Sequence, residues 1–494
     1  MLFMITTSAL RLLRAEIIED DGTIVDVDFA SEPGPESWTT LITGRNGSGK
    51  SRLLSAIALA FDALDGNKPR RTVNASVEYM LNGHLCAIHI ERKMASGFLD
   101  GREVPLDLLP RPRAVAAITA GAFDKFHLPI SQSLFDPSRQ RTGLYRYLGL
   151  KDPRGRVSTK SGVFRALDNL FEATRLNAQR RGRIARVFEY LGYKPQVEVL
   201  YRWTKRGRAF LEAGANKGPT GYRMFLENER AERSSDLRPI LGNYFFEEPS
   251  AISQLGRAAD YLMGLGDGKT LALMAEFSTQ QWSEDPTFQQ AQQLSRARLI
   301  EMQEVRLRKK LTGAIINIED ASSGELALAT AMLGIASSID DHSLILIDEP
   351  EISLHPAWQA DYLRHLSDIL GAFHGCHFVL ATHSATLVSG APPEQSSVVD
   401  IETSGGGGEV MSGKSADEVL VRTFGVAQDG NLYLRQLLVE ALRLVADRDT
   451  NEKRFVDILT ELQGIAGTLP STSPVRQLVA DLSHARPTRN GAIA

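Results

Sequence analysis

The sequence has few cysteines and no long apolar run. Cys86 and Cys376 lie in distant segments of a 494-residue chain, whereas a secreted protein of this size would usually carry more cysteines, in pairs. No run of 18 apolar residues occurs, so we expect no membrane-spanning helix. The apolar start at 1–10 is not followed by a signal-peptide cleavage pattern. These absences predict a cytoplasmic protein with two buried thiols and no membrane partner.

The chain also lacks the sequence patterns of a nuclease and of a long coiled coil. Its ten histidines are scattered, and neither an H-N-H cluster nor a set of zinc ligands occurs. The region 431–494 carries no acidic cluster of the kind that holds metal ions in nucleases. The region 131–320 shows no sustained heptad pattern. We therefore expect no nuclease centre, and a compact subdomain over 131–320.

Charge is distributed unevenly along the chain. The overall net charge is only −4. Over 131–210, however, 18 basic residues face 6 acidic ones, a local net charge of +12 that leaves −16 for the remainder. Such asymmetry predicts either contact with an anionic partner such as nucleic acid or a solvated helical surface. Charge reversal at Arg180, Arg181 and Arg183 would distinguish the two.

Apolar patterning predicts strands in the first third of the chain and again after residue 340. The pairs Asp21-Gly22 and Asn82-Gly83 each lie between two alternating stretches, which predicts two hairpins. Continuous apolar runs predict strands buried on both faces. These runs are 343–347 and 377–381, and strands are also expected at 38–43 and 113–120.

The middle and the end of the chain favour helices. Over 131–320 we expect helices at 162–190, 252–265 and 287–311, a strand at 196–203 and a loop at 213–221. Ser415 begins a capping-box pattern that predicts a helix start, after a four-glycine turn at 405–408. The region 431–483 has the pattern of amphipathic helices.

A glycine loop follows the strand expected at 38–43. It fits G-x-x-x-x-G-K-S and precedes a helical stretch, which is the context that this phosphate-binding motif requires. The glycines let backbone N–H groups turn toward a phosphate at a helix N-terminus. We expect Lys50 to bridge the β- and γ-phosphates of ATP and the Ser51 hydroxyl to ligate Mg²⁺. The nucleotide-binding residues of the loop are Gly44, Arg45, Asn46, Gly47, Ser48, Gly49, Lys50 and Ser51.

The apolar strand expected at 343–347 ends in two acids, Asp348 and Glu349. Buried carboxylates are costly unless something compensates them, and a metal ion with a polarised water would do so. We expect Asp348 to hold Mg²⁺ and Glu349 to orient the attacking water. The alternative is a pair of acids in a solvated turn.

Two further polar motifs flank this strand in the sequence. Ser322-Ser323-Gly324-Glu325 precedes an apolar helix, and serines with a glycine at a helix start can bind an anion. Alone, this motif would be an ordinary N-cap. His383 follows the apolar run at 377–381, where it can reach a γ-phosphate, although a lone histidine is more often an ordinary core or surface residue.

The order of these four motifs resembles that of ABC-type ATPases. The string Asp348-Glu349-Pro350-Glu351, with Leu354-His355-Pro356 and Gln359, is similar to the D-E-P-E-x-x-L-H-P-x-x-Q string of the SMC/RecF-like branch. This branch includes stand-alone bacterial ATPases of anti-phage defence operons. The segment 114–126 resembles one found in the Septu-type and retron-associated ATPases, which act with a separate HNH nuclease.

The resemblance implies an α/β fold, namely an ABC-type P-loop nucleotide-binding domain. Its mixed sheet would be flanked by helices and joined by an antiparallel β subdomain, a helical insertion and C-terminal helices. The implied parts are an N-terminal lobe at 1–130, a basic, mainly helical insertion at 131–320, a second ATPase lobe at 321–430 and a helical region at 431–494.

The resemblance also implies roles and partners. ATP and Mg²⁺ would be the cofactors, and Glu349, His383 and Lys50 would carry a slow hydrolysis. Head-to-tail homodimers, or larger oligomers built from them, would let Ser322 and Gly324 contact the γ-phosphate bound by the other chain, with 353–356 as the D-loop. The implied function is a sensor or regulator in anti-phage defence that controls a separate effector such as an HNH nuclease.

Two departures from the family pattern leave other functions open. Ala321 stands where the family usually has leucine. No glutamine directly follows 113–120; Gln132 and Gln140 lie further on, and Asp124 could substitute. A RecF-like DNA-repair ATPase and a nucleotide-gated scaffold with negligible turnover are the alternatives. A transporter ATPase subunit is disfavoured by the L-H-P string.

Overall fold

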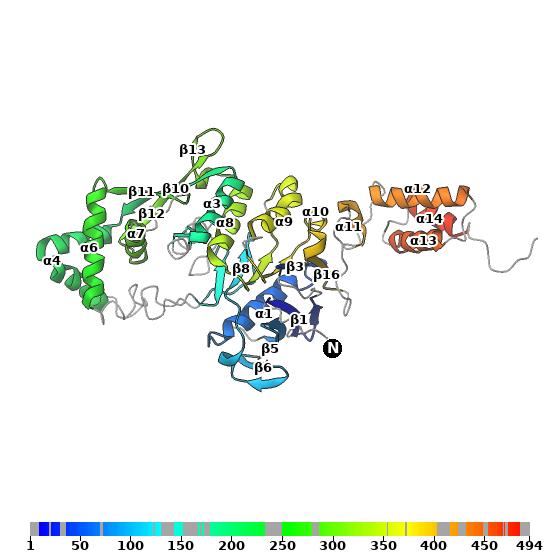
Figure 1. Cartoon of the computed structure of the whole chain (residues 1–494), viewed down its shortest axis with the longest axis horizontal. Helices are drawn as coiled ribbons and strands as arrows, with labels where there is room; N and C mark the ends of the chain where they lie inside the picture. Colours follow the sequence, from blue (N-terminus) through cyan, green and yellow to red (C-terminus); the bar gives the residue numbers. More distant parts are fainter. Residues whose placement is uncertain are drawn as a thin grey trace, which may run out of the picture.

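The protein is described here by a computed structural model. In Figure 1 a central α/β body carries the insertion on one side and a bundle of C-terminal helices on the other. The structure describes residues 9–18, 21–29, 36–69, 73–121, 124–129, 143–151, 166–167, 170–171, 178–232, 249–278, 286–352, 354–370, 373–402, 415–422, 431–447, 453–467, 469 and 473–484.

A six-stranded parallel sheet forms the centre of the body, in the order β16-β3-β15-β14-β8-β9. Its strands are β3 (Trp38–Thr43), β8 (Val115–Thr119), β9 (Tyr145–Leu148), β14 (Leu344–Asp348), β15 (His377–Ala381) and β16 (Ser396–Asp400). The buried strands predicted from continuous apolar runs are confirmed. The strand β9 follows residue 130 and still belongs to this sheet.

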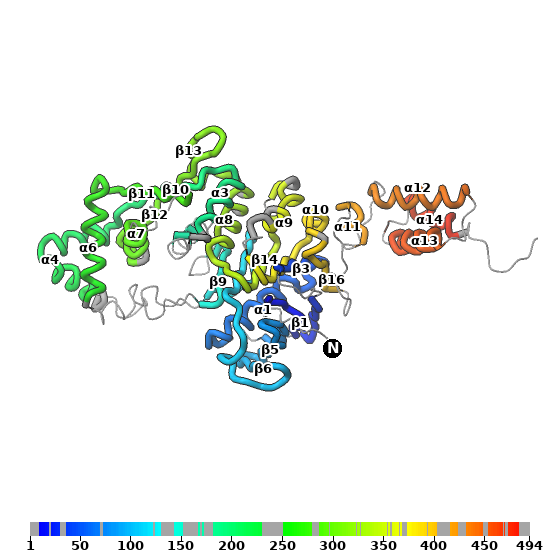
Figure 2. Tube along the Cα trace, in the orientation of Figure 1, coloured from blue at the N-terminus to red at the C-terminus, as the bar shows by residue number. Residues whose placement is uncertain are grey.

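Both faces of the central sheet are covered, which explains why its strands do not alternate in polarity. Ile42 and Leu346 pack into one core with α1 (Lys50–Ala63). Their neighbours Leu41 and Ile345 enter a second core with α8 (Ser323–Ser338) and α9 (Pro356–Leu370). Figure 2 shows α1 on one side of the sheet, with α8 and α9 on the other. The short helices of this body are η1 (Leu106–Leu108), α10 (Ala385–Ser389) and η5 (Pro393–Gln395).

A second, antiparallel sheet covers α1, in the order β2-β1-β4-β5-β6-β7. Both predicted hairpins are confirmed, since β1 pairs with β2 and β4 with β5. Gly22 and Gly83 occupy their turns with φ of 84° and 81°, a conformation that favours glycine. The strands are β1 (Arg11–Ile18), β2 (Ile24–Asp28), β4 (Asn74–Leu81), β5 (His84–Glu91), β6 (Met94–Leu99) and β7 (Arg102–Val104).

The insertion combines helices with a four-stranded antiparallel sheet, in the order β11-β10-β12-β13. The strands are β10 (Tyr193–Trp203), β11 (Thr270–Glu276), β12 (Ile300–Lys309) and β13 (Ile315–Asn317), and η4 (Ile318–Asp320) follows. The helices are α3 (Ala178–Tyr190), α4 (Lys205–Glu232), α6 (Pro249–Leu265) and α7 (Thr287–Arg296). The strand predicted at 196–203 is therefore confirmed.

Two expectations for the insertion are wrong. The region 287–311 is not one helix, because α7 ends at Arg296 and β12 begins at Ile300; a register shift in β12 interrupts the alternation that would have revealed a strand. The region 213–221 is not a loop but part of α4. Gly218, with φ 57° and ψ −145°, kinks that helix just before Pro219.

The C-terminal helices have a hydrophobic core of their own. They are α11 (Ala416–Arg422), α12 (Leu432–Ala446), α13 (Lys453–Ala466) and α14 (Pro474–His484). Ser415 caps α11 as predicted, because its Oγ accepts from the Glu418 N–H at 3.1 Å. The four-glycine turn lies outside the described residues. Among the helices that the structure describes, none is long and apolar enough to cross a membrane.

Candidate functional site

The glycine loop connects β3 to α1 and curls around the side chain of Lys50. Gly44, Gly47 and Gly49 have φ of 144°, 88° and 103°, values that side chains disfavour. The Lys50 ammonium donates to the carbonyl oxygens of Gly44 at 2.9 Å and Arg45 at 3.0 Å. Burial lowers the pKa of Lys50, whereas Glu349 and Asp348 oppose this shift. The loop is thus a P-loop whose lysine lies beside the predicted acids.

The first acid, Asp348, ends β14 next to the start of α1. Its Oδ1 accepts from the Ser51 hydroxyl at 2.9 Å, and the residue is only 4% exposed. Burial raises the pKa of Asp348 to about 7, against the lowering effect of the Ser51 hydrogen bond. The two expected metal ligands are therefore neighbours, although their segments are far apart in the sequence.

The second acid, Glu349, lies beside His383. The backbone of Glu349 is left-handed, with φ 48°, and its N–H donates to the Ala381 carbonyl oxygen at 2.9 Å. This places its Oε1 3.7 Å from Nε2 of His383. Burial and the nearby Lys50 charge lower the pKa of His383, although Glu349 opposes them. The net effect favours the neutral form of the imidazole.

The order of the strands explains why these groups meet. The strand β15 lies between β3, which leads into the P-loop, and β14, which leads into the two acids. Parallel strands end at the same edge of a sheet, about 4.8 Å apart. His383, just after β15, is thereby placed between the P-loop and Glu349.

The serine-rich motif begins α8, where Ser322 is the N-cap. Its Oγ accepts from the Glu325 N–H at 3.2 Å, and its own N–H donates to Glu325 Oε2 at 3.0 Å. This capping box accounts for the local hydrogen bonds of both residues. Ser322 is exposed, whereas Gly324 is buried in the first turn of α8. Ser323 begins the helix, but its side chain lies outside the described part of the chain.

The residues at the strand ends fit Mg²⁺ and a nucleoside triphosphate. Asp348 is a buried carboxylate, and the Ser51 hydroxyl beside it is a second hard oxygen ligand of the kind that Mg²⁺ prefers. Lys50 and the inward-turned loop supply positive charge and N–H groups for phosphates. Ser51 and Asp348 would hold the ion, which would neutralise charge on the phosphate oxygens.

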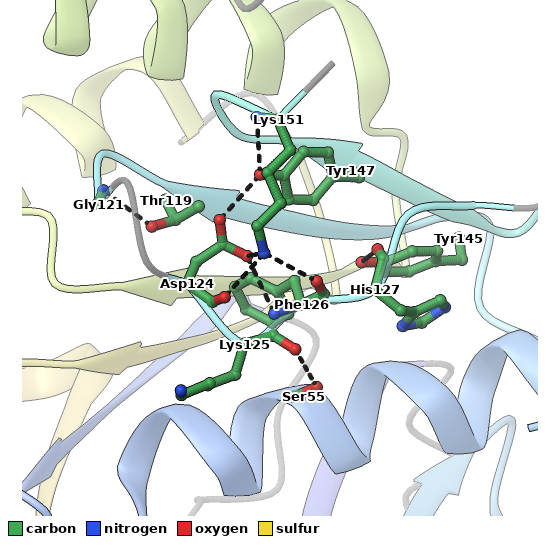
Figure 3. A network of polar contacts seen from close by, with 10 residues as sticks. All are labelled: Ser55, Thr119, Gly121, Asp124, Lys125, Phe126, His127, Tyr145, Tyr147 and Lys151. Atoms are coloured by element: carbon green, nitrogen blue, oxygen red, sulfur yellow. Dashed lines mark hydrogen bonds and ion pairs between the residues drawn. The ribbon is translucent and has the colours of Figure 1, made fainter. Parts of the chain in front are cut away.

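Asp124, the residue that could substitute for the expected glutamine, has a carboxylate held by neighbouring side chains (Figure 3). Oδ1 accepts from the Lys151 ammonium at 2.8 Å, and Oδ2 accepts from the Tyr147 hydroxyl at 2.9 Å. Lys151 also donates to the Asp124 and Phe126 carbonyl oxygens at 2.7 and 3.3 Å. Asp124 therefore belongs to a buried ion pair with Lys151. Gln132 and Gln140 lie outside the described residues.

Two of the three arginines chosen to represent the basic stretch are packed against the protein. Arg181 is only 9% exposed. The Arg183 guanidinium lies 3.9 Å from the centroid of the Phe373 ring. The Arg180 side chain is outside the described residues. Charge reversal at Arg181 or Arg183 would therefore perturb packing, and these residues are poor probes of nucleic-acid contact.

Three polar residues whose roles do not follow from the sequence hold the loops around the site. Glu402, just after β16, accepts from the Arg45 N–H at 2.7 Å and holds the start of the P-loop. Glu351 accepts from the His383 N–H at 2.6 Å. Gln359 accepts from the Ser384 hydroxyl at 2.7 Å. The D-E-P-E-x-x-L-H-P-x-x-Q string contains the last two, but only the adjacency of β14 and β15 reveals what they contact.

The parallel sheet, the P-loop between β3 and α1, the acidic end of β14 and the intervening β15 define an α/β P-loop nucleotide-binding domain. The predicted fold class is confirmed. Part of this domain also matches a known family. Residues 160–389 match the family described as "AAA domain, putative AbiEii toxin, Type IV TA system". The match includes Ser322, Asp348, Glu349 and His383 and begins after the P-loop.

Individual relatives resemble smaller or more divergent portions of the chain. Protein ea59 of Escherichia phage lambda is 37% identical over 71 residues, which are 14% of this chain and 13% of that protein. The SMC head domain from Thermotoga maritima is 14% identical with a TM-score of 0.32, over 79% of this chain and 94% of that one. The Smc head domain from Pyrococcus furiosus, with an extended coiled coil and bound to the C-terminal domain of ScpA, gives a TM-score of 0.32 and 14% identity over 79% and 93%.

Proposed function

We propose that this chain is a Mg²⁺-dependent ATPase that cleaves ATP to ADP and phosphate. One observation carries the proposal. At a single edge of the central sheet, the P-loop lysine, the Ser51–Asp348 pair and the Glu349–His383 pair meet. Glu349 would orient the attacking water, and a neutral His383 can accept or donate a hydrogen bond at the γ-phosphate.

We further propose that two chains complete each other's sites. Ser322 is exposed at the N-terminus of α8, and helix N-termini favour anions. A second chain in head-to-tail orientation would bring this serine and Gly324 to the γ-phosphate held by Lys50. ATP would then control whether the dimer forms, and Glu349→Gln, which keeps the shape of the side chain, would trap it.

For the biological role we propose a sensor or regulator in anti-phage defence that controls a separate effector nuclease. The description of the family matched by 160–389 names a toxin of a toxin–antitoxin system, which is compatible with a defence role. The D-E-P-E string that begins at Asp348 supports the same assignment through its resemblance to defence ATPases. Co-purification of the chain with the product of the adjacent gene tests this part; recovery of an HNH protein supports it.

A nucleotide-gated scaffold is the second candidate, and Asp124 favours it. No glutamine directly follows 113–120, and the carboxylate of Asp124, which could substitute for it, is held by Lys151 and Tyr147. Such a site would bind ATP tightly and turn it over slowly.

Phosphate release and dimerisation distinguish these candidates. We expect slow turnover by the wild type, loss of nucleotide binding or turnover in Lys50→Ala, and an ATP-bound dimer in Glu349→Gln, measured by light scattering after size exclusion. Exposed Glu394→Ala is the matched control. Tight ATP binding without detectable wild-type turnover would favour the scaffold. Turnover that neither Lys50→Ala nor Glu349→Gln affects would contradict the site assignment.

A further inference from the structure

One side chain from the turn after β14 and one from α9 hold the loop after β15. Oε1 of Glu351 accepts from the His383 backbone N–H at 2.6 Å. Oε1 of Gln359 accepts from the Ser384 hydroxyl at 2.7 Å. The strands β14 and β15 are neighbours in the parallel sheet, so these two bonds tie together loops that begin at the same edge. The two bonds thereby hold the consecutive residues His383 and Ser384 against the segment that follows β14.

Gln359 also fixes the turn that carries Glu351. Its Nε2 donates to the Leu354 carbonyl oxygen at 3.1 Å and to the Glu351 carbonyl oxygen at 3.5 Å. Ser384 in turn caps α10, since its Oγ accepts from the Leu387 N–H at 3.1 Å. A continuous set of hydrogen bonds therefore runs from the turn after β14, through Gln359 and Ser384, into the helix that follows His383.

The carboxylate of Glu351 is partly buried behind the loop that it holds. Its Oε2 is shielded from solvent, and burial raises the pKa of Glu351 against the lowering effect of the hydrogen bonds from His383 and Thr382. Burying a carboxylate costs stability even when hydrogen bonds offset part of the cost, and the bond from the His383 N–H is short. A position maintained at that cost, directly behind the histidine that faces Glu349, points to a role in the site.

We infer that Glu351 is a positioning residue for the reaction. It holds the backbone of His383 so that Nε2 stays 3.7 Å from Glu349 Oε1, and Gln359 keeps Glu351 in place. Glu351 itself acts only through His383. The inference rests on the proposed ATPase function and adds to it a residue that the motif assignment leaves without a role.

A double-mutant cycle tests this role. Misplacing a positioned group by about 1 Å can cost on the order of 100-fold in rate, so we expect Glu351→Ala to lower kcat by about 10- to 100-fold. The KM for ATP should change by less than about threefold, because the P-loop supplies the binding contacts. Glu351→Gln, whose amide oxygen can still accept from the His383 N–H, should restore most of the turnover.

The cycle separates positioning from a general effect on folding. In a His383→Ala background, Glu351→Ala should cause no further loss, since the group that it positions is gone. The inference is overturned if Glu351→Ala slows the His383→Ala protein as much as it slows the wild type. It is also overturned if Glu351→Gln is as slow as Glu351→Ala while both retain the wild-type melting temperature.

Hydrogen exchange gives an answer that does not depend on turnover. We expect the peptide 382–388 to exchange its amide hydrogens faster in Glu351→Ala than in the wild type, and at the wild-type rate in Glu351→Gln and in exposed Glu394→Ala. Unchanged exchange in Glu351→Ala would overturn the positioning contact. If the wild type hydrolyses no ATP, the proposed enzyme fails, and exchange still decides whether Glu351 holds His383.

Discussion

The carboxyl of Asp348 should destabilise the nucleotide-free protein, and the size of this effect follows from its environment. Burial raises its pKa from 3.8 to about 7, and the residue is 4% exposed. An acid whose pKa is higher in the folded than in the unfolded state costs stability once it ionises. The cost is absent below the unfolded pKa, grows as pH rises, and is complete above the folded pKa. At about 1.4 kcal/mol per pKa unit, a shift of about three units costs about 4 kcal/mol.

Asp348→Asn removes this charge and keeps an oxygen that can accept from the Ser51 hydroxyl. We therefore expect the variant to be more stable than the wild type without metal or nucleotide, by about 4 kcal/mol near pH 8 and by roughly half that near pH 5.5. Urea denaturation at both pH values, with a chelator present, measures the difference. Asp107→Asn, at an exposed position in η1, is the control and should show no such trend.

Mg²⁺ and ATP should narrow the stability difference between the wild type and Asp348→Asn. A ligand that binds only the folded state adds about 2.7 kcal/mol to the free energy of unfolding at a hundred times its Kd. Mg²⁺ and ATP should therefore stabilise the wild type by about this amount and leave the stability of Asp348→Asn unchanged. A stability difference that does not widen between pH 5.5 and 8 would refute the argument that Asp348 carries a buried, uncompensated charge. Equal stabilisation of both proteins by Mg²⁺ and ATP would remove Asp348 from the metal site.

Two further substitutions probe the loop and the clamp beside it. Gly44→Ala places a Cβ 2.5 Å from Ile401 Cγ2 at φ 144°, so we expect a loss of about 1–3 kcal/mol in stability together with weaker ATP binding by calorimetry. Gly66→Ala, also at positive φ but in open space, is its control, and equal ATP affinity in both variants would contradict the expectation. Lys151→Met leaves the buried Asp124 carboxylate unpaired, which should cost about 3–5 kcal/mol in urea denaturation. Asp124→Asn added to Lys151→Met should recover part of this loss, and additive losses would count against the ion pair.

The sequence was sufficient for the parts of the site that depend on local pattern. The P-loop and its flanking strand and helix follow from consecutive residues, and the buried strands that end at Asp348 and Ala381 follow from continuous apolar runs. The sequence could not show that β15 lies between β3 and β14, because strand order is set by long-range pairing. The roles of Glu351 and Gln359 depend on that order. The pairing of Asp124 with Lys151 was also invisible, since it joins two loops 27 residues apart.

The same strand order explains why the site is poised for a cation. It brings the carboxylates of Asp348, Glu349 and Glu351 to one edge of the sheet, where the pKa of Lys50 is lowered by burial and raised by all three. A single lysine cannot neutralise three carboxylates. The site therefore favours the binding of additional positive charge and disfavours a polyphosphate that carries no metal ion. If a nucleotide binds together with Mg²⁺, the charge of the ion would offset that of the Asp348 carboxylate. Lys50 would then be able to contact the phosphates. If the chain binds ATP as proposed, we expect it to prefer the Mg²⁺ complex over free ATP, because the topology of the sheet decides which acids face the P-loop.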